Sequence, residues 1–113
     1  MRQSLHPHLI LALCVGLLPG AAQASLELAD KAGCTSCHVV DQRKMGPPFR
    51  EVAKKYQDDP QAFAQLREKV RQGGRGVWGR APMPPYGPDK ISDADLDALL
   101  RWVLDLSKSS AAQ

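Results

Sequence analysis

The sequence is poor in the residue types that usually carry out acid–base catalysis or hold metal clusters. Its 113 residues include three cysteines and three histidines, and aromatic residues make up 5% of the chain. The alternation of apolar and polar residues that marks a β-strand does not occur over any length. These features argue against a zinc module, a β-sheet protein and catalysis by the chain itself, and we predict that it is not an enzyme.

A long hydrophobic run is also missing. The longest, from Leu9 to Leu18, is about half of the ~20 residues that a membrane-spanning helix needs. Arg2 precedes this run and Ala22-Gln23-Ala24 follows it, which is the pattern of a signal peptide with its cleavage site. We therefore predict a cleaved signal peptide over residues 1–24, an exported domain over residues 25–113, and a periplasmic location without a stable membrane anchor.

A lipoprotein anchor is the alternative interpretation of this N-terminal segment. It would attach through Cys14, but Leu13 stands where a small residue is expected before a lipidated cysteine. Cleavage after residue 24 is favoured, and it would remove Cys14 together with His6 and His8. The mature chain then has two cysteines and one histidine, too few for a network of structural disulfides.

These three remaining residues stand in one motif, Cys34-Thr35-Ser36-Cys37-His38, the attachment sequence of a c-type haem. On a helix, Cys34 and Cys37 share a face, so both sulfurs reach the two vinyl groups of one porphyrin edge, and His38 meets the iron from that face. A disulfide redox pair would need a βαβ pattern and a zinc site further ligands, and the sequence offers neither. We predict one covalent haem c with His38 as its imidazole ligand, and a bis-histidine haem within one chain is excluded.

The other axial position has two neutral candidates, Met45 and Met83. Met83 lies in Pro82-Met83-Pro84-Pro85, where the prolines fix the backbone and remove N–H groups. A thioether–iron bond is weak, so a sulfur that is held in place beforehand lowers the ordering cost of making it. Met45 adjoins Gly46 and lies close to His38 along the chain, which places it on the proximal side. The residues favour Met83, with an open iron or another ligand as the alternative.

Apolar residues at helical spacing predict four helices. Asp59 and Pro60 mark the start of the third helix, and Gly73-Gly74 its end. Ser92 caps the fourth helix, and a frayed tail is expected after Ser107. The expected helices cover about residues 26–31, 49–56, 60–72 and 93–106.

Basic residues are concentrated in the first part of the mature chain. Residues 31–80 hold eleven bases and five acids, whereas residues 81–113 hold three bases and five acids. This pattern fits either ordinary solvated helix faces or a basic rim that steers acidic redox partners. Nucleic acid is not an expected partner, because no stripe of basic and aromatic residues is present. The group expected to border the haem edge is Arg43, Lys44, Lys54 and Lys55.

Five segments of the chain, taken together and in this order, match the sequence pattern of a known family. They are Gly33-Cys34-Thr35-Ser36-Cys37-His38, Lys44-Met45-Gly46-Pro47, Gly76-Val77-Trp78-Gly79, Pro82-Met83-Pro84-Pro85 and Arg101-Trp102-Val103-Leu104. With them, residues 26–106 resemble the small bacterial class I cytochromes c, periplasmic donors to haem cd nitrite reductase and terminal oxidases. The resemblance implies an all-α class I cytochrome c fold, with four short helices wrapped around one covalently attached haem.

The resemblance also implies roles for individual residues. His38 and Met83 would be the axial ligands of the iron. The Pro47 carbonyl would accept the proximal His38 ring N–H and so fix the orientation of the imidazole. Trp78 would donate its indole N–H to a haem propionate. By its position on the third helix, Lys69 would help neutralise that propionate.

The chain departs from the family pattern at two places. No aromatic residue precedes Cys34, so Leu28 or Ala29 is expected to pack against Trp102, where the family commonly has an aromatic residue. Family members often carry an asparagine after the Met-Pro-Pro segment that bonds the ligand sulfur, whereas this chain has Tyr86. Whether the Tyr86 hydroxyl takes over that bond is left open by the sequence.

By resemblance, the chain is a monomeric single-electron carrier of the periplasm. Its donor would be a membrane quinol-oxidising complex, and its acceptor a nitrite reductase or terminal oxidase. Two alternatives stay open: a haem-based sensor of small ligands with a displaceable Met83, and a dedicated electron-transfer subunit of a sulfur-oxidising enzyme.

Overall fold

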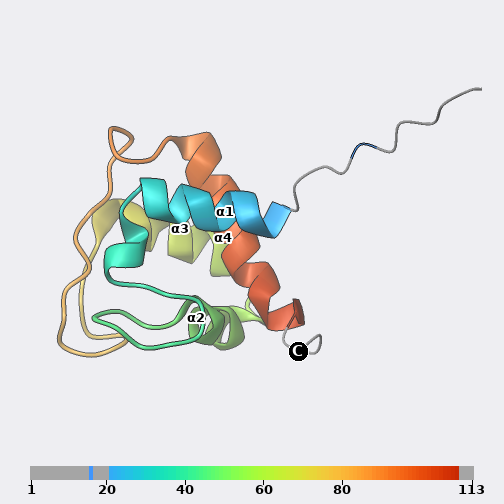
Figure 1. Ribbon diagram of the computed structural model, residues 1–113. Helices are drawn as coiled ribbons and strands as arrows, with labels where there is room; N and C mark the ends of the chain where they lie inside the picture. Colours follow the sequence, from blue (N-terminus) through green and yellow to red (C-terminus); the bar gives the residue numbers. More distant parts are fainter. Residues whose placement is uncertain (1–15, 17–20, 110–113) are drawn as a thin grey trace, which may run out of the picture.

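The computed structural model describes Gly16 and residues 21–109, with side chains from Ser25 onward. This part of the chain forms four α-helices and one 3-10 helix, with no β-strand (Figure 1). The prediction of an all-α fold is confirmed. The elements are α1 (Ala21–Lys31), η1 (Cys34–Ser36), α2 (Phe49–Tyr56), α3 (Ala62–Gln72) and α4 (Asp93–Ser109). Across the described residues, we find no helix with both the length and the apolar character needed to span a bilayer.

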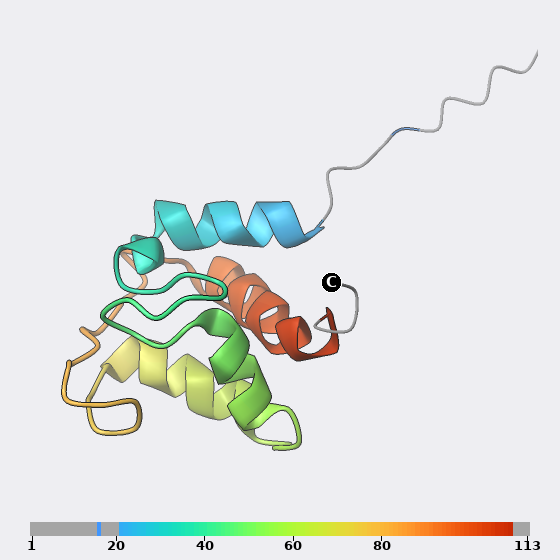
Figure 2. The same cartoon turned by 60° about the horizontal axis from the view of Figure 1, so that its bottom comes forward.

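Helix α4 is the centre of the fold and packs against each of the other three α-helices. Figure 2 shows α4 between α1 on one side and α2 and α3 on the other. The two long connections, residues 37–48 and 73–92, both contribute to the wall of one cavity. The helices therefore form a frame, and the irregular segments carry most of the residues of chemical interest.

The buried faces of α2 and α4 form the core. Helix α2 covers the residues predicted for it and buries Phe49, Val52 and Ala53, which share one helical face. These side chains meet the apolar stripe of α4 in a single hydrophobic cluster. The buried residues of α4 are those predicted from the spacing: Leu96, Leu99, Leu100, Val103 and Leu106.

Helix α1 begins at Ala21, earlier than the predicted start at Leu26, and ends at Lys31 as predicted. Its first residues belong to the predicted cleavage motif, so cleavage after Ala24 would remove the first turn. Residues 1–15 and 17–20 of the predicted signal peptide lie outside the described residues. The signal peptide therefore stays a prediction.

The crossing of α1 with α4 uses a small residue. Ala29 is fully buried in the core, and Leu28 is half-buried beside it. The ring contact of Trp102 is made by Phe49 of α2, edge to face at 5.6 Å between ring centroids. An aromatic residue thus packs on Trp102, but it comes from α2 and not from the N-terminal helix.

Helix α3 starts two residues later than the sequence predicted. Residues 60 and 61 form a turn, and the α-helix begins at Ala62. Asp59 still acts at this end, because its carboxylate accepts the Gln61 N–H at 2.8 Å and its carbonyl accepts the Ala62 N–H at 3.1 Å. The predicted end is confirmed: Gly73 follows the last helical residue with φ 70°, a conformation that favours glycine.

Helix α4 has the predicted start and a longer end. The Ser92 hydroxyl accepts the Asp95 N–H at 3.1 Å, which is the expected N-cap bond. The prediction of a frayed tail after Ser107 is wrong for the next two residues, since the helix continues to Ser109. There the Ser107 and Ser109 hydroxyls donate to carbonyls of the preceding helical turn. Residues 110–113 lie outside the described part of the chain.

Candidate functional site

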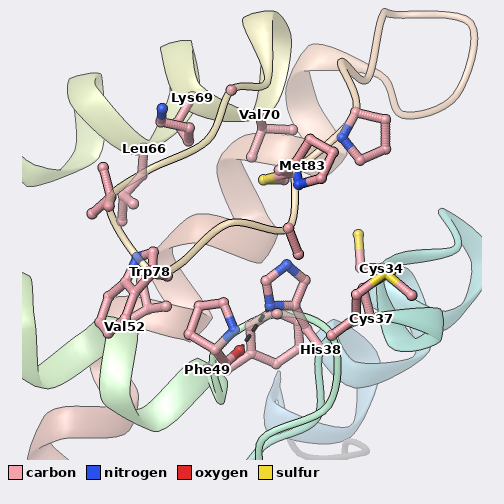
Figure 3. Close-up of a pocket in the computed structure, with 18 of the residues that line it drawn as sticks. Cys34, Cys37, His38, Phe49, Val52, Leu66, Lys69, Val70, Trp78 and Met83 are labelled. Carbon is pink, nitrogen blue, oxygen red and sulfur yellow. Dashed lines mark hydrogen bonds between the residues drawn. The ribbon is translucent and has the colours of Figure 1, made fainter.

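A cavity of about 280 Å³ lies between the helices and the two long connections. Its walls are mainly apolar and include Val52 of α2, Leu66 of α3 and Leu96 of α4. Figure 3 shows the side chains of Cys34, His38 and Met83 around the same space. The two sequence segments with the strongest motifs, residues 34–38 and the proline-flanked Met83 segment, therefore meet at one site.

The two cysteines reach the cavity from η1. Gly33 adopts φ 84° and ends the preceding helical segment, so that the chain turns into the 3-10 helix. Cys34 begins this helix and Cys37 directly follows its last residue, and the two sulfurs stand at one edge of the cavity (Figure 3). Both carry free, half-buried thiols. Burial raises the pKa of the Cys34 thiol.

His38 is held in one orientation by two neighbours. Its Nδ1 lies 2.8 Å from the Pro47 carbonyl oxygen, and because a carbonyl only accepts, Nδ1 carries the proton. The Phe49 ring stacks on the imidazole at 5.3 Å between centroids. The other ring nitrogen, Nε2, points into the cavity toward Met83 (Figure 3). Nε2 is left with its lone pair free to bind a metal.

Gly46 makes this placement of the imidazole sterically possible. A β-carbon at residue 46 would lie 2.6 Å from His38 Cε1 and 2.9 Å from Nδ1, closer than real contacts allow. Its N–H donates to the Cys37 carbonyl at 2.9 Å, which holds the loop against the motif. Glycine is therefore required here by close approach, and the sequence alone gives no sign of that contact.

Met83 enters the cavity from the side opposite His38 (Figure 3). Its backbone pairs with Gly74 in both directions, with Gly74 N–H to Met83 carbonyl at 3.0 Å and the reverse bond at 2.8 Å. Met45, the other candidate from the sequence, is 66% exposed. Its sulfur lies 3.9 Å from Cys37 Sγ. The structure brings Met83, and not Met45, face to face with His38.

Trp78 and Lys69 both line the cavity, at the end away from the cysteines (Figure 3). Arg43 donates to the Trp78 carbonyl at 3.3 Å, and the Lys55 ammonium lies 5.6 Å from the centre of the Trp78 ring. The Lys69 ammonium lies against Gly74, 3.0 Å from where a β-carbon would stand. Trp78 and Lys69, the two residues predicted to bind a haem propionate, therefore lie at the same end of the cavity.

The cavity wall carries an excess of positive charge. Among the described residues that line it there is no aspartate or glutamate, although Arg43 pairs with Glu51 outside the lining at 3.9 Å. Of the predicted basic group, Arg43 lines the cavity, Lys55 stands over Trp78 as noted, and Lys44 donates to the Thr35 carbonyl at 3.0 Å. Arg75 and Arg80 were not predicted from the sequence as basic residues near the haem. Their position beside Trp78 in a glycine-rich segment could have indicated them. The lining cations are Arg43, Lys69, Arg75 and Arg80.

Tyr86 lies near the cysteines. Its hydroxyl is 4.0 Å from the position of a β-carbon on Gly33, and the Lys90 ammonium lies 4.9 Å from its ring centre. Burial, followed by the nearby Cys34 and Cys37 thiols, raises the pKa of Tyr86. Within the described residues, the Tyr86 hydroxyl forms no hydrogen bond with the Met83 sulfur.

A covalent c-type haem fits this set of side chains. The two free thiols share one edge, an imidazole nitrogen with a free lone pair faces a thioether across the cavity, and the walls between them are apolar. The lining cations and the Trp78 indole suit the carboxylate groups at the other edge of a haem. The donor set of one imidazole and one thioether is one that holds haem iron in electron carriers.

Comparison with known proteins leads to the same family. The model of the cytochrome c family matches residues 22–107. Cytochrome c-552 of Nitrosomonas europaea is 43% identical over 90 residues, which cover 80% of this chain and 85% of the relative. Cytochrome c2 of Rubrivivax gelatinosus is 46% identical over 78 residues, covering 69% and 92% of the two chains.

A solved structure supports the assignment at the level of the fold. The crystal structure of wild-type Nitrosomonas europaea cytochrome c552 aligns with a TM-score of 0.68 and 41% identity, covering 73% of this chain and 99% of that one. The chain therefore belongs to the cytochrome c family: it is a small class I cytochrome c with one covalently bound c-type haem, related to electron carriers.

Proposed function

We propose that this protein is a periplasmic single-electron carrier whose haem iron is ligated by His38 and Met83. The observation that carries the proposal is the placement of the His38 Nε2 and the Met83 side chain on opposite sides of one cavity, with both cysteine sulfurs at its edge (Figure 3). Cys34 and Cys37 form the thioether bonds. The haem supplies an iron that alternates between the ferric and ferrous states.

The protein residues keep that site rigid. The Pro47 carbonyl fixes the His38 ring, and the Phe49 ring limits its rotation. The two hydrogen bonds with Gly74 hold Met83 before any metal bond forms. Because both sides are held, little rearrangement accompanies a change of charge, which suits electron transfer better than ligand binding. Trp78 and Lys69 bind the propionates, and Arg75 and Arg80 add positive charge at the same edge.

Residues 25–113 offer no histidine or cysteine beyond those assigned to the haem. His38 is the one histidine of residues 25–113, and it serves as a ligand. Cys34 and Cys37 are the only cysteines of that range, and both are consumed by attachment. A carrier without catalysis of its own is the function that remains.

The location and the partners follow from the signal peptide and the family. Export would place residues 25–113 in the periplasm as a monomer. The donor would be a membrane quinol-oxidising complex, and the acceptor a nitrite reductase or terminal oxidase. Redox complexes of this kind are brief and bury less than ~1,200 Å², so a small apolar patch around the cysteine edge is enough for docking.

The visible spectrum of the exported protein tests the ligation. The wild-type protein should be low-spin in both redox states, show the weak long-wavelength sulfur-to-iron band, and bind no CO. Met83→Ala should lose the band and bind CO, whereas Met45→Leu should behave as wild type. A wild-type protein without the band that binds CO readily would overturn the carrier proposal in favour of a small-ligand sensor.

A further inference from the structure

The segment that carries Met83 has few hydrogen-bond donors of its own. Four of the seven residues from 82 to 88 are prolines, which lack an N–H. The Met83 N–H is used by Gly74, and the Tyr86 N–H donates to the Val70 carbonyl at 2.9 Å. The Gly87 carbonyl is bonded within the following turn, by the Lys90 and Ile91 N–H groups, whereas the Tyr86 and Ile91 carbonyls take their donor from another element.

Arg71, in the last turn of α3, supplies those donors. Its Nη1 donates to the Tyr86 carbonyl at 2.9 Å and to the Ile91 carbonyl at 3.0 Å. Its Nη2 donates to the Asp93 carboxylate at 2.6 Å, at the start of α4. The Arg71 side chain is only 19% exposed, so its two bonds to carbonyls are partly shielded from competing water. One guanidinium thus holds both ends of the 86–93 connection against α3.

This connection is rigidly joined to Met83. Pro84 and Pro85 separate Met83 from Tyr86, and their fixed φ angles leave little freedom between the two residues. On the other side, Gly73 ends α3 and packs directly on the Met83 carbonyl, where a β-carbon would overlap it. The Met83 thioether is therefore held from two sides. On one side Met83 pairs with Gly74, and on the other the backbone of Tyr86 is fixed by two hydrogen bonds, one from its N–H and one to its carbonyl.

We propose that Arg71 is a positioning residue that holds the Met83 sulfur in place for the iron by bonding the Tyr86 and Ile91 carbonyls. This inference rests on the proposed His38–Met83 ligation. Without Arg71, the two carbonyls lose a charged donor, and the segment from Met83 onward is fixed by backbone bonds alone. The Met83 sulfur then leaves its place more often, and an external ligand competes for the position.

The chain contains a matched control in Arg67, one turn earlier on α3. Arg67 pairs with Asp93 at 3.2 Å and with Asp97 at 2.9 Å, so it also joins α3 to α4. It bonds no carbonyl of the Met83 segment within the described residues. A purely structural contribution of a helix-joining arginine should therefore appear in both Arg67→Gln and Arg71→Gln.

The test uses the haem-loaded protein and three variants, Arg71→Gln, Arg71→Lys and Arg67→Gln. The readouts are the intensity of the sulfur-to-iron band, the reduction potential, the apparent affinity for CO and the thermal midpoint. Arg71→Gln should weaken the band, lower the potential and raise the CO affinity on the order of tenfold, the fold-change that one charge-assisted hydrogen bond is worth. Arg71→Lys should fall between wild type and Arg71→Gln, because an ammonium does not reproduce the planar fork of donors.

Arg67→Gln should lower the thermal midpoint while leaving the band, the potential and the CO affinity unchanged. The proposal is overturned if Arg71→Gln loses stability but keeps the wild-type band and CO affinity. If Arg71→Gln does not accumulate as a folded protein, the same two readouts, the sulfur-to-iron band and the CO affinity, are measured on Arg71→Lys, and wild-type values in that variant overturn the proposal. Failure of the ligation itself is seen separately, since wild-type protein would then already lack the band, and both proposals would fall.

Discussion

At the scale of single residues, the site depends on contacts so close that an added side-chain atom would not fit. Gly46 is the clearest, because its backbone lies against the face of the ligand imidazole. Gly46→Ala should push His38 away from the Pro47 carbonyl and destabilise the protein by about 1–3 kcal/mol, the usual cost of overpacking. The reduction potential should shift as well, since the imidazole loses its fixed orientation. Thermal unfolding and redox titration of the haem-loaded protein measure the two effects.

Gly87→Ala is the control for this substitution. A β-carbon at residue 87 would meet only the end of the Asp89 side chain, which is exposed and can move away. This variant should keep the potential of the wild type. Equal shifts in the two glycine variants would show that crowding of His38 is not the cause.

Residues with a chemical signature could be found from the sequence, and residues defined by packing could not. The motif around Cys34 and His38 and the proline-flanked Met83 identify themselves by spacing and neighbours. Arg71 gave no such signal, because two of its three partners are backbone carbonyls fifteen and twenty residues away, which any residue type would supply. The contact of Gly46 with His38 is likewise visible only when the loop is folded.

At the scale of the elements, the end of α3 decides where Met83 lies. Gly73 has φ 70° and Gly76 has φ 98°, so alanine is strained at both positions. A β-carbon at residue 73 would also overlap the Met83 carbonyl, whereas one at residue 76 would meet nothing within 4 Å. Gly76→Ala should therefore lower the free energy of unfolding by about 1–2 kcal/mol through backbone strain alone. Gly73→Ala should lower it by more, because the overlap with the Met83 carbonyl adds to the strain.

Spectroscopy separates the two glycine variants further. Gly73→Ala should weaken the sulfur-to-iron band, because the Met83 backbone has to move, and Gly76→Ala should leave it intact. Denaturant unfolding gives the two stabilities. A Gly73→Ala protein with the same stability and band as Gly76→Ala would contradict the role assigned to this helix end.

The pairing of α3 with α4 makes stability depend on acid pH. The hydrogen bond from Arg71, followed by the charge of Arg67, lowers the pKa of Asp93. A carboxyl with a lowered folded pKa adds stability above its unfolded pKa of about 4, and this contribution is lost as the pH falls through the folded pKa. Asp93→Asn should be less stable than wild type at pH 7, and the difference should shrink below about pH 4.

The thermal midpoints of Asp93→Asn and wild type, measured from pH 7 to pH 2.5, show whether this difference in stability shrinks. Asp105→Asn is the control, since Asp105 pairs with Lys108 on the surface, where both side chains are largely exposed. Its curve should run parallel to that of the wild type. A constant gap between Asp93→Asn and wild type over the whole range would exclude the carboxylate of Asp93 as the titrating group.

The helices themselves were largely predictable, and their ends were less so. Helix α2 and the start of α4 follow from apolar spacing and the Ser92 cap, which act locally. The start of α3 moved by two residues because the Asp59 carboxylate bonds the Gln61 N–H within a turn, which the Asp-Pro signal does not distinguish from a helical first turn. The packing of Trp102 on Phe49 depends on how α2 meets α4, and no local pattern encodes that.

At the scale of the whole molecule, the four cations of the cavity wall should act on charged reactants. Arg75 and Arg80 are exposed and line the cavity. Replacing both with glutamine should slow electron exchange with hexacyanoferrate(III), an anion, by several-fold at low salt, where the Debye length is ~30 Å. The pair Arg101→Gln and Lys108→Gln removes the same charge outside the cavity wall and should slow it less. Stopped-flow rates over a range of salt concentrations compare the two variants, and equal effects would point to net charge alone.

The cavity also determines how the chain folds. Its walls come from α2, α3, α4 and both long connections, and they include the core residues Leu96, Leu99 and Leu100. Without haem, the apolar side chains of these walls would lose part of their burial, at a cost of about 25 cal/mol for each Å² of apolar surface left in water. A polypeptide core of this size contributes only ~3–5 kcal/mol. The haem-free chain is therefore not expected to hold the structure described here.

Circular dichroism of residues 25–113, produced without haem attachment, tests this balance. We expect partial helix content, because α4 has a strong cap and a continuous apolar stripe. We expect no cooperative thermal transition, since Met83, Trp78 and much of the 73–92 connection line the cavity and lose the surface they would share with a haem. The haem-loaded protein should unfold in one cooperative step. A haem-free chain that melts with similar cooperativity would mean that α1, α2 and α4 form a self-sufficient core, and that the haem is bound by a preformed fold and does not complete it.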